Sequence, residues 1–373
     1  MSRALFTSII FLFSVSLYGG DYGEFIVKPR ISPLDFLFGN SFITGHSHNY
    51  IRSVGNGKMS LVYGTIEELQ NDPNIIWVER NVKIHLDPSY KQIRDFPEEE
   101  KGSWGIEKIM AQKAWELGIR GKGIRVAVID TGVDHTHPAL AGKVLTDEGF
   151  NFITKTKDAM DDHSHGTHCS GTIAGNVIGV APDAKIIPLK FLDAEGSGDL
   201  AAAVDAIAYA TKIKVNIMSN SWGGGGYEKS LFEVIDEARS AGILFIAAAG
   251  NEYSDNDKTP AYPASYNLAN VVSVAATDKE DKKAKFSNWG KKTVHVAAPG
   301  VKIYSSVLKG GYAEYSGTSM ATPHVAGLAA LLLSKGVSYK DVRKTMMDTG
   351  DKVEINTISG TRINAESAVK DDQ

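Results

Sequence analysis

Four short motifs carry side chains suited to nucleophilic catalysis. Asp130 ends the apolar run VAVID, and His165 lies in DDHSHGTHCSGT, where an imidazole is the usual general base for a hydroxyl. Ser319 lies in SGTSMATPHVAG at the expected start of an apolar helix, whose dipole and unbonded N–H groups would face an anion formed there. Asn251 ends AAAGN and carries an amide that could donate to an oxyanion. These residue types are those of acyl transfer through an activated serine.

Each of these residues also has an ordinary structural explanation. Asp130 could cap a loop, and Asn251 could occupy a turn, because both residue types favour such positions. Ser319 could be the N-cap of its helix, which is the commonest role of serine there. His165 and His168 could both be structural. None of these roles explains why Gly, Thr and Ser crowd both sides of Ser319.

The histidine-rich motif also allows a metal site. Together with Asp162, the set Asp161, His163, His165 and His168 offers the carboxylate and imidazole ligands that zinc takes in proteins. A metal-dependent hydrolase built on these residues is therefore an alternative to the serine chemistry.

The candidate residues lie in a region of alternating strands and helices. Helical patterns cover 199–212, with Asp199 as N-cap, and 228–241, closed by Gly242. Continuous apolar runs indicate strands covered on both faces; they span 125–130, 185–192, 215–222, 243–250, 271–276 and 294–299. This order predicts a doubly wound, mostly parallel α/β sheet with helices on both faces. In such sheets active residues gather beyond the carboxyl ends of the strands.

A smaller unit precedes this region. Strand patterns at 24–29, 59–64 and 75–86, with a capping box at Thr65 to Glu68 that starts a short helix, predict a small α+β domain. Residues 87–102 are polar and lack periodicity, which indicates a linker. The predicted boundaries therefore divide the chain into 1–20, 21–86, 87–102 and 103–373.

The N-terminus and the composition restrict the protein class. Arg3, an apolar run from Ala4 to Tyr18 and two glycines predict a secretory signal peptide over 1–20, and a run this short predicts no stable membrane anchor. We therefore expect export, either to the medium or to a periplasm. Cys169 is the only cysteine, so no internal disulfide forms. A net charge of -4 without basic clusters argues against nucleic-acid binding.

The four motifs, in the order Asp, His, Asn, Ser, resemble the subtilisin family of serine peptidases from about Trp104 to Val369. The resemblance implies that Asp130 orients His165, that His165 takes the proton of Ser319, and that Ser319 attacks the peptide carbonyl. Asn251 and the backbone N–H of Ser319 would hold the oxyanion. Water would then hydrolyse the acyl-enzyme, with no cofactor for catalysis. A non-catalytic, peptide-binding relative would be expected to lack a triad member, and all three are present.

The resemblance also implies a cleft for extended polypeptide substrates. Backbone pairing along the cleft would make specificity broad, with a preference for apolar or aromatic side chains. The two edges would be formed by Ser221, Trp222 and Gly223 and by Gly196 and Gly198. Ala248, Gly250 and Glu252 would border the primary pocket, and Leu192, Leu200 and Trp222 a more distant apolar one.

Several details concern thiol and ion binding. Cys169 follows His168 directly, as in part of the family, and is expected to be a buried apolar thiol. The segment from Thr172 to Pro182 is too short for the family's tight calcium loop. Structural calcium near 262–269, or at Asp158, Asp161 and Asp162, is compatible with hard oxygen ligands, and the family places a cis peptide bond at Tyr262-Pro263.

Residues 21–86 resemble the family's prosegment, which acts as an intramolecular chaperone and inhibitor with its tail in the substrate cleft. The resemblance implies self-cleavage near Leu86, or at a bond before Ser103, and a monomeric mature enzyme.

Overall fold

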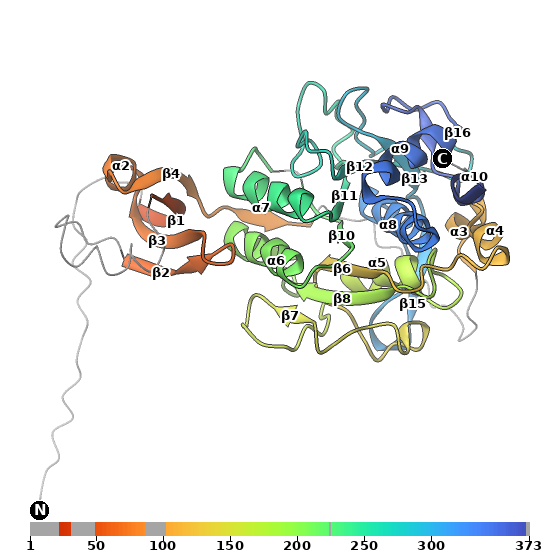
Figure 1. Ribbon diagram of the computed structural model, residues 1–373, viewed down its shortest axis with the longest axis horizontal. Coiled ribbons are helices and arrows are strands. Elements are labelled where there is room, and N and C mark those ends of the chain that lie inside the picture. The colour runs from red at the N-terminus through yellow and green to blue at the C-terminus, as the bar shows by residue number, and fades with distance from the viewer. Residues whose placement is uncertain (1–21, 31–48, 87–101, 224, 371–373) are drawn as a thin grey trace, which may run out of the picture.

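The computed structural model of the chain describes residues 22–30, 49–86, 102–223 and 225–370. The predicted signal peptide and nearly all of the predicted linker lie outside the described residues. Figure 1 shows a small four-stranded sheet at one end of the long axis, beside a larger α/β unit.

The small unit is an antiparallel sheet with one short helix. Its strands are β1 (Tyr22–Pro29), β2 (Asn49–Val54), β3 (Met59–Thr65) and β4 (Ile75–Arg80), in the order β2-β3-β1-β4. Helix α2 (Ile66–Asn71) begins with the predicted capping box, because the Thr65 side chain accepts from the Glu68 N–H and Glu68 reaches back to Thr65.

The predicted strand over 75–86 is broken in two. β4 ends at Arg80, and β5 (Lys83–His85) pairs instead with β9 (Ser197–Asp199) of the large unit. The Asn81 side chain lies at the break and accepts a 2.9 Å hydrogen bond from the Ala201 N–H. A tertiary contact therefore ends the local sheet, which no periodicity in 75–86 could reveal.

The large unit is built on a nine-stranded, mostly parallel sheet, which confirms the predicted fold class. The strand order is β16-β17-β13-β12-β11-β10-β6-β8-β7, and only β16 and β17 pair antiparallel. The strands are β6 (Arg125–Asp130), β7 (Phe150–Asn151), β8 (Lys185–Lys190), β10 (Ile217–Asn220), β11 (Leu244–Ala248), β12 (Val271–Thr277), β13 (Val296–Pro299), β16 (Asp351–Lys352) and β17 (Thr361–Arg362).

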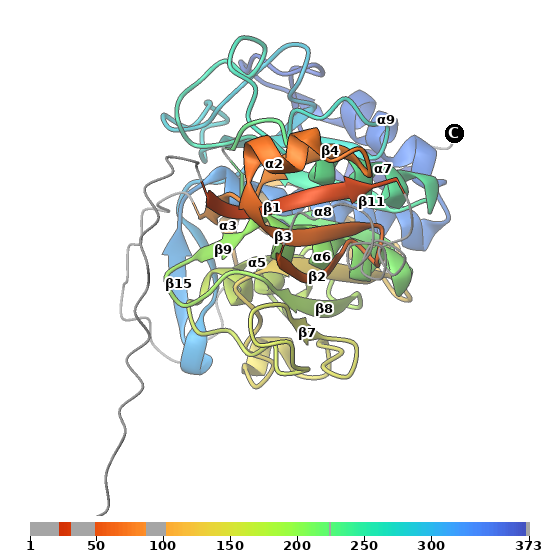
Figure 2. The same cartoon turned by 90° about the vertical axis from the view of Figure 1, so that its left-hand side faces the viewer.

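Helices cover both faces of this sheet. On one face lie α6 (Leu200–Lys212) and α7 (Lys229–Ser240), and on the other α5 (His165–Ala174) and α8 (Thr318–Lys335). Figure 2 shows the four-stranded sheet across the outer side of α6 and α7. The remaining elements are α3 (Trp104–Lys108), α4 (Ala111–Glu116), α9 (Tyr339–Thr349), α10 (Ala365–Lys370), the 3-10 turns at Pro138–Leu140 and Leu308–Gly310, and the hairpin of β14 (Ile303–Ser306) and β15 (Tyr312–Tyr315).

Burial on both faces explains the continuous apolar runs in the sequence. Along β11, Leu244 and Ile246 contribute to one core while Phe245 and Ala247 contribute to the other, and all four are at most 1% exposed. Complete burial of a large aliphatic or aromatic side chain contributes about 1.5–3 kcal/mol. The sheet is therefore a rigid base for residues at its carboxyl edge.

Among the described residues, no single helix is long and apolar enough to cross a membrane. α8 and α9 meet the length and composition requirement only as a pair bent by 119°.

Candidate active site

Asp130 and His165 form a buried pair. Asp130 is the last residue of β6 and His165 the first of α5, and both are at most 1% exposed. The His165 Nδ1 lies 2.8 Å from the Asp130 Oδ1, which also accepts from the Thr131 N–H at 2.7 Å. A carboxylate against Nδ1 fixes the tautomer so that Nε2 can take up a proton.

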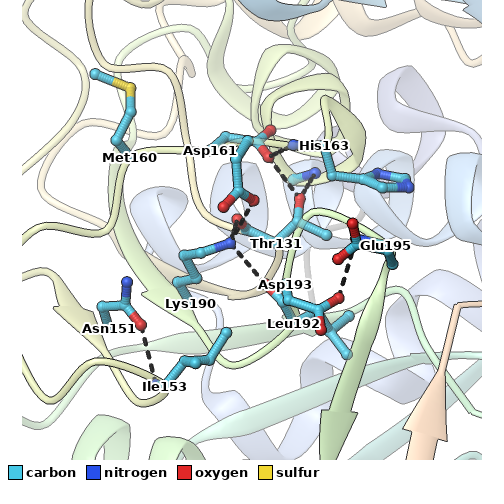
Figure 3. A network of polar contacts seen from close by, with 12 residues as sticks. Thr131, Asn151, Ile153, Met160, Asp161, His163, Lys190, Leu192, Asp193 and Glu195 are labelled. Atoms are coloured by element: carbon cyan, nitrogen blue, oxygen red, sulfur yellow. Dashed lines mark hydrogen bonds and ion pairs between the residues drawn. The ribbon is translucent and has the colours of Figure 1, made fainter.

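Asp161 holds the start of the helix that carries His165. Its carboxylate accepts five hydrogen bonds, from the Thr131 and Thr167 hydroxyls and from the N–H groups of His163, Ser164 and Thr167, at 2.6–3.1 Å. Ser164, the formal N-cap, has φ 92° and makes no side-chain cap. Asp161 therefore caps α5 and, through Thr131, ties it to the turn after Asp130 (Figure 3).

Lys190, the last residue of β8, is a buried cation behind the same turn. Its Nζ donates to the main-chain carbonyls of Thr131 and Leu192, each at 2.7 Å, and to the Asp162 carboxylate at 2.6 Å. Figure 3 shows the ammonium beside Thr131 and Leu192. Because an ammonium has three donors, this cage of three oxygens satisfies it completely. Lys190 thereby links the Asp130 turn to the chain that leads into β9.

Ser319 lies in the first turn of α8 and is 3% exposed. Its hydroxyl donates to the Ser221 carbonyl at 2.8 Å, while the Ser221 hydroxyl donates to the Ser319 carbonyl at 2.9 Å. This reciprocal pair fixes the start of α8 against the chain that follows β10. The N-cap of α8 is Gly317, so Ser319 does not serve as the helix cap.

Asn251 follows β11 and is oriented by Thr318. The Asn251 Oδ1 accepts from the Thr318 N–H at 2.8 Å and from the Thr318 hydroxyl at 2.9 Å. With its oxygen held by the first residue of α8, the amide presents its Nδ2 in another direction. The structure thus brings Asn251 and Ser319 together at one end of α8.

Cys169 lies against the other residues of this site. It is fully buried, and its Sγ lies 3.5 Å from the Ser319 carbonyl. Burial raises the pKa of the thiol, and the nearby Asp130 carboxylate adds to that effect. The thiol therefore stays protonated, as the sequence predicts for an apolar cysteine.

The predicted metal-ligand set does not come together. His168 points elsewhere: its Nε2 lies 2.9 Å from the Ile303 carbonyl, its ring stacks on Tyr315, and burial lowers its pKa to about 3. Among the described residues, the close group of ligand atoms is Asp130, His165 and Cys169, without Asp161, His163 or His168. The zinc alternative is therefore wrong, because Asp161 is saturated by donors and His168 is a structural, neutral imidazole.

The same contacts disfavour calcium at Asp158, Asp161 and Asp162. Asp161 accepts its five hydrogen bonds from protein donors, and Asp162 forms an ion pair with Lys190. A divalent ion would have to replace both, so this set does not fit calcium. The bond Tyr262-Pro263 is cis, as predicted.

The expected substrate edge carries a strand from the small unit. β5 pairs antiparallel with β9, with Ile84 opposite Gly198, and hydrogen bonds join Leu86 N to Gly196 O and Leu200 N to Val82 O. Close packing explains the two glycines. A Cβ on Gly198 would lie 2.4 Å from the Phe191 carbonyl, and Gly196 has φ 72°.

A cavity of about 270 Å³ lies between this strand and the large unit. Of the predicted substrate-binding residues, Leu200, Trp222, Gly223 and Glu252 line it. Leu192 was expected to line a pocket, but its side chain is fully buried and packs against Gly198 of β9. Ser221 is bonded to Ser319, Ala248 ends β11, and the Gly250 N–H donates to the Thr318 hydroxyl at 3.3 Å.

Sequence reasoning missed the roles of Asp161, Lys190 and Ser221. Asp161 carried a usable signal, because an acidic residue shortly before a helix start is a capping candidate. Lys190 carried a weaker one, since a lysine at the end of a strand buried on both faces needs internal acceptors. The bond between Ser221 and Ser319 spans 98 residues and left no local signal.

Comparison with known proteins gives a consistent result. Residues 121–362 match the model of the subtilase family. Thermitase of Thermoactinomyces vulgaris is 40% identical over 280 residues, covering 72% of this chain and 95% of thermitase. Subtilisin E of Bacillus subtilis (strain 168) is 39% identical over 285 residues, 74% of this chain and 70% of the relative.

Two further matches agree. A thermophilic serine proteinase of Bacillus sp. (strain AK1) is 37% identical over 327 residues, which cover 84% of this chain and 77% of that protein. The crystal structure of a cold adapted subtilisin-like serine proteinase superimposes with a TM-score of 0.61 at 32% identity, covering 66% of this chain and 90% of the other. The chain belongs to the subtilase family and is a subtilisin-type serine endopeptidase.

Proposed function

We propose that Ser319, His165 and Asp130 are the catalytic triad of this endopeptidase. The observation that carries the proposal is the buried 2.8 Å contact between His165 and Asp130 at the carboxyl edge of the sheet, beside the α8 start that holds Ser319. In the reaction, the Ser319 hydroxyl turns from the Ser221 carbonyl to His165 Nε2. Its oxygen attacks the scissile carbonyl carbon as Nε2 takes the proton.

Asn251 and the backbone N–H of Ser319 stabilise the tetrahedral oxyanion in this proposal. Thr318 supports it, because it holds Oδ1 and so leaves the amide nitrogen as the group turned toward the reacting carbonyl. His165 then protonates the leaving amine, and water hydrolyses the acyl-enzyme by the reverse proton path. No step requires a metal ion or cofactor.

The polypeptide substrate binds as an extended strand along β9. Backbone pairing gives affinity without regard to sequence, so specificity is broad, and the apolar Leu200 and Trp222 favour apolar or aromatic side chains. β5 supports this placement, because it lies antiparallel on the same edge.

Residues 21–86 act as an inhibitory prosegment that the enzyme removes from itself. The β5 strand would block substrate while it occupies the β9 edge, and the cut falls near Leu86 or at a bond before Ser103. The N-terminal sequence supports export of the precursor to the medium or a periplasm. Calcium near 262–269 remains a candidate structural ion, and the mature enzyme is a monomer.

Processing of the precursor tests the proposal. Ser319→Ala should leave the full chain unprocessed, and a serine-directed sulfonyl reagent should abolish peptide hydrolysis by the wild type. Cys169→Ala is the matched control, because it removes a neighbouring nucleophile that the mechanism does not use. Processing of the Ser319→Ala precursor without added protease would contradict both the nucleophile and self-cleavage.

A further inference from the structure

The tail of the small unit leaves part of the cleft unfilled. Along residues 82–86, exposure alternates: Lys83 and His85 are exposed, while Val82, Ile84 and Leu86 are half-buried against the core that includes Leu200 and Trp222. A cavity of about 270 Å³ still remains beside Val82 and Ile84. A side chain longer than isoleucine therefore has room at this position.

The cavity wall is mostly apolar, and its carboxylates are Glu228 and Glu252, of which Glu252 accepts from the Asn288 side-chain amide at 2.6 Å. Leu200, Trp222 and Leu231 contribute buried apolar surface, each at most 3% exposed. Glu228, the N-cap residue of α7, lies on the same wall, and its side chain makes no capping hydrogen bond. The wall thus combines aliphatic and aromatic surface with a carboxylate that the helix does not use.

Glu228 has no compensating cation in the part of the chain that the structure describes. Among the described residues, no lysine, arginine or histidine forms an ion pair with it, and the charged neighbour that acts on it is Glu79 of β4. Burial, and then Glu79, raise the pKa of Glu228 to about 7. A half-buried carboxylate in a peptide-binding cavity is best stabilised by a cation that the peptide brings.

The side chains that satisfy both features are lysine and arginine. Their methylene stems cover apolar surface while the charged head reaches a polar group at the end. Ile84 covers the apolar part of the wall and offers no charge to Glu228. The tail of the chain is thus an incomplete match to the cavity.

We infer that Glu228 makes the subsite beside Ile84 select lysine or arginine in polypeptide substrates. The inference rests on the proposed function, because it assumes that substrates take the path of β5 along β9. At this one position it replaces the apolar preference with one for a long side chain whose stem is apolar and whose end is charged, because Leu200, Trp222 and Glu228 line the same cavity. At the other positions backbone pairing governs binding.

The preference needs an ionised Glu228. Burial and Glu79 raise the pKa of Glu228 in the assembled chain, and Glu79 leaves with the small unit, so Glu228 is charged in the mature enzyme at pH 8.5. The ionisable groups around Glu228 are Glu79 of β4, Lys83 and His85 of β5, Glu252 and Tyr262 on the cavity wall, Lys229 beside it, Glu233 of α7, and Tyr227 and Tyr266, the last bonded to the Glu228 main chain. Of these, Glu79, Lys83 and His85 leave with the small unit.

A lysine scan tests the inference in the mature enzyme. Internally quenched peptides carry lysine, or norleucine as its apolar counterpart, at each of the six positions before the cut bond. The lysine-to-norleucine ratio of kcat/KM is measured at pH 8.5 and pH 5.5. Variants are Glu228→Gln, Glu228→Lys and, as a charge-matched surface control, Glu280→Gln, which is exposed in a distant loop.

We expect one position at which the ratio in the wild type exceeds that in Glu228→Gln about fivefold at pH 8.5, the size of a partly exposed ion pair. At pH 5.5 the difference should be no larger, because protonation of Glu228 can only remove its charge. Glu280→Gln should behave as the wild type, and Glu228→Lys should have a lower lysine-to-norleucine ratio than Glu228→Gln at the same position. Active enzymes whose ratios agree at every position would overturn the inference and leave the proposed function intact. Hydrolysis that resists the serine reagent would overturn the proposed function and the inference with it.

Discussion

Two regions of the molecule differ in how far their buried charged groups are compensated by partners. Behind His165, Asp161 and Lys190 are buried and each has a full set of partners at 2.6–3.1 Å. Where the small unit meets α7, Glu79 is buried enough to raise its pKa and lies near Glu228, whereas Glu233 is paired with Lys28 at 3.0 Å and accepts from the Trp77 indole N–H at 3.0 Å. The Glu79 carboxylate is held by the N–H groups of Lys229 and Ser230 at the start of α7.

The difference in charge compensation agrees with how long each contact has to last. Under the proposed mechanism the network behind His165 has to hold one geometry through every catalytic cycle, and full pairing of buried charges gives such rigidity. The contact on α7 has to form during folding and separate afterwards under the proposed maturation. Glu79 and Glu228 repel each other across that contact when both are ionised, and this repulsion lowers its stability.

The largest expected effect comes from removing the buried cation. Lys190→Met leaves the Thr131 and Leu192 carbonyls without their donor, and each buried unpaired acceptor costs about 1–3 kcal/mol. The free energy of unfolding should therefore fall by about 3 kcal/mol. It is measured by urea denaturation in a Ser319→Ala background, which prevents self-digestion.

Lys185→Met is the matched control, since Lys185 begins the same strand but is half-exposed. Its effect should stay below about 1 kcal/mol. If Lys190→Met and Lys185→Met lowered the free energy of unfolding equally, the hydrogen bonds around Lys190 would not contribute more than a half-exposed lysine does. The contrast between the two regions would then be wrong.

A smaller effect, on catalysis, is expected from Asp161→Asn. The variant replaces one acceptor oxygen of Asp161 with an NH2 group, which would face an N–H or O–H donor and could not accept its hydrogen bond. The start of α5 would then shift away from Asp130. We expect kcat to fall about tenfold to a hundredfold, with KM nearly unchanged, because positioning acts on the reacting groups. Steady-state kinetics with one fluorogenic peptide measure both constants.

Asp158→Asn is the control for this change, because Asp158 is exposed and its carboxylate accepts a hydrogen bond from the Met160 N–H, outside the set of donors that Asp161 binds. A comparable fall in kcat for both variants would show that negative charge in the loop matters, and not the capping geometry of Asp161.

Local signals in the sequence predicted much of the fold. The N-cap Asp199 of α6 and the capping box at Thr65 lie within three residues of their partners, so their patterns are visible in the sequence. The apolar runs located the central strands because both faces of the sheet are covered. The family motifs placed Asp130, His165, Asn251 and Ser319 at the same edge.

The missed features depend on contacts between distant segments. Lys190 meets Thr131 across 59 residues, and Asn81 meets Ala201 across 120. Leu192 was assigned to a pocket wall through the family resemblance, whereas its side chain is fully buried beside Gly198. Residue type and spacing therefore indicate the proposed reacting groups, whereas the groups that position them depend on contacts between distant segments.

The contact on α7 should weaken as pH rises. The pKa of Glu79 and that of Glu228 are both raised above 4.5, to about 7 for Glu228, so the assembled form favours the protonated carboxyls. Its stability is therefore greatest at low pH and falls as pH rises from about 4.5 through about 7. In the Ser319→Ala precursor, amide hydrogen exchange of β1, corrected for intrinsic rates, should show about tenfold less protection at pH 8 than at pH 5.

Glu79→Gln shows how much of this pH dependence comes from Glu79 and how much from Glu228. The amide keeps the shape of Glu79 and removes its charge, so the loss of protection with pH should become shallower. An unchanged pH dependence in Glu79→Gln, or protection that increases with pH, would contradict the proposed role of these carboxyls.

The smallest effect is expected at the rim of the same contact. The Lys58 ammonium lies 2.8 Å from a Glu237 carboxylate oxygen, but the lysine side chain is 52% exposed, so solvent and salt screen the pair. Arg52 is 28% exposed, contacts Asp205, and lies beside the Gly55 N–H that bonds the same carboxylate. Lys58→Ala should therefore change the opening free energy of β1 by at most about 0.5 kcal/mol, and Arg52→Ala by about 1 kcal/mol, in the same exchange experiment. Added salt should reduce the first difference more than the second. If Lys58→Ala opened the small unit as readily as Arg52→Ala, exposed charges would hold this contact together, and the repulsion among carboxylates at its centre would not be what limits its stability.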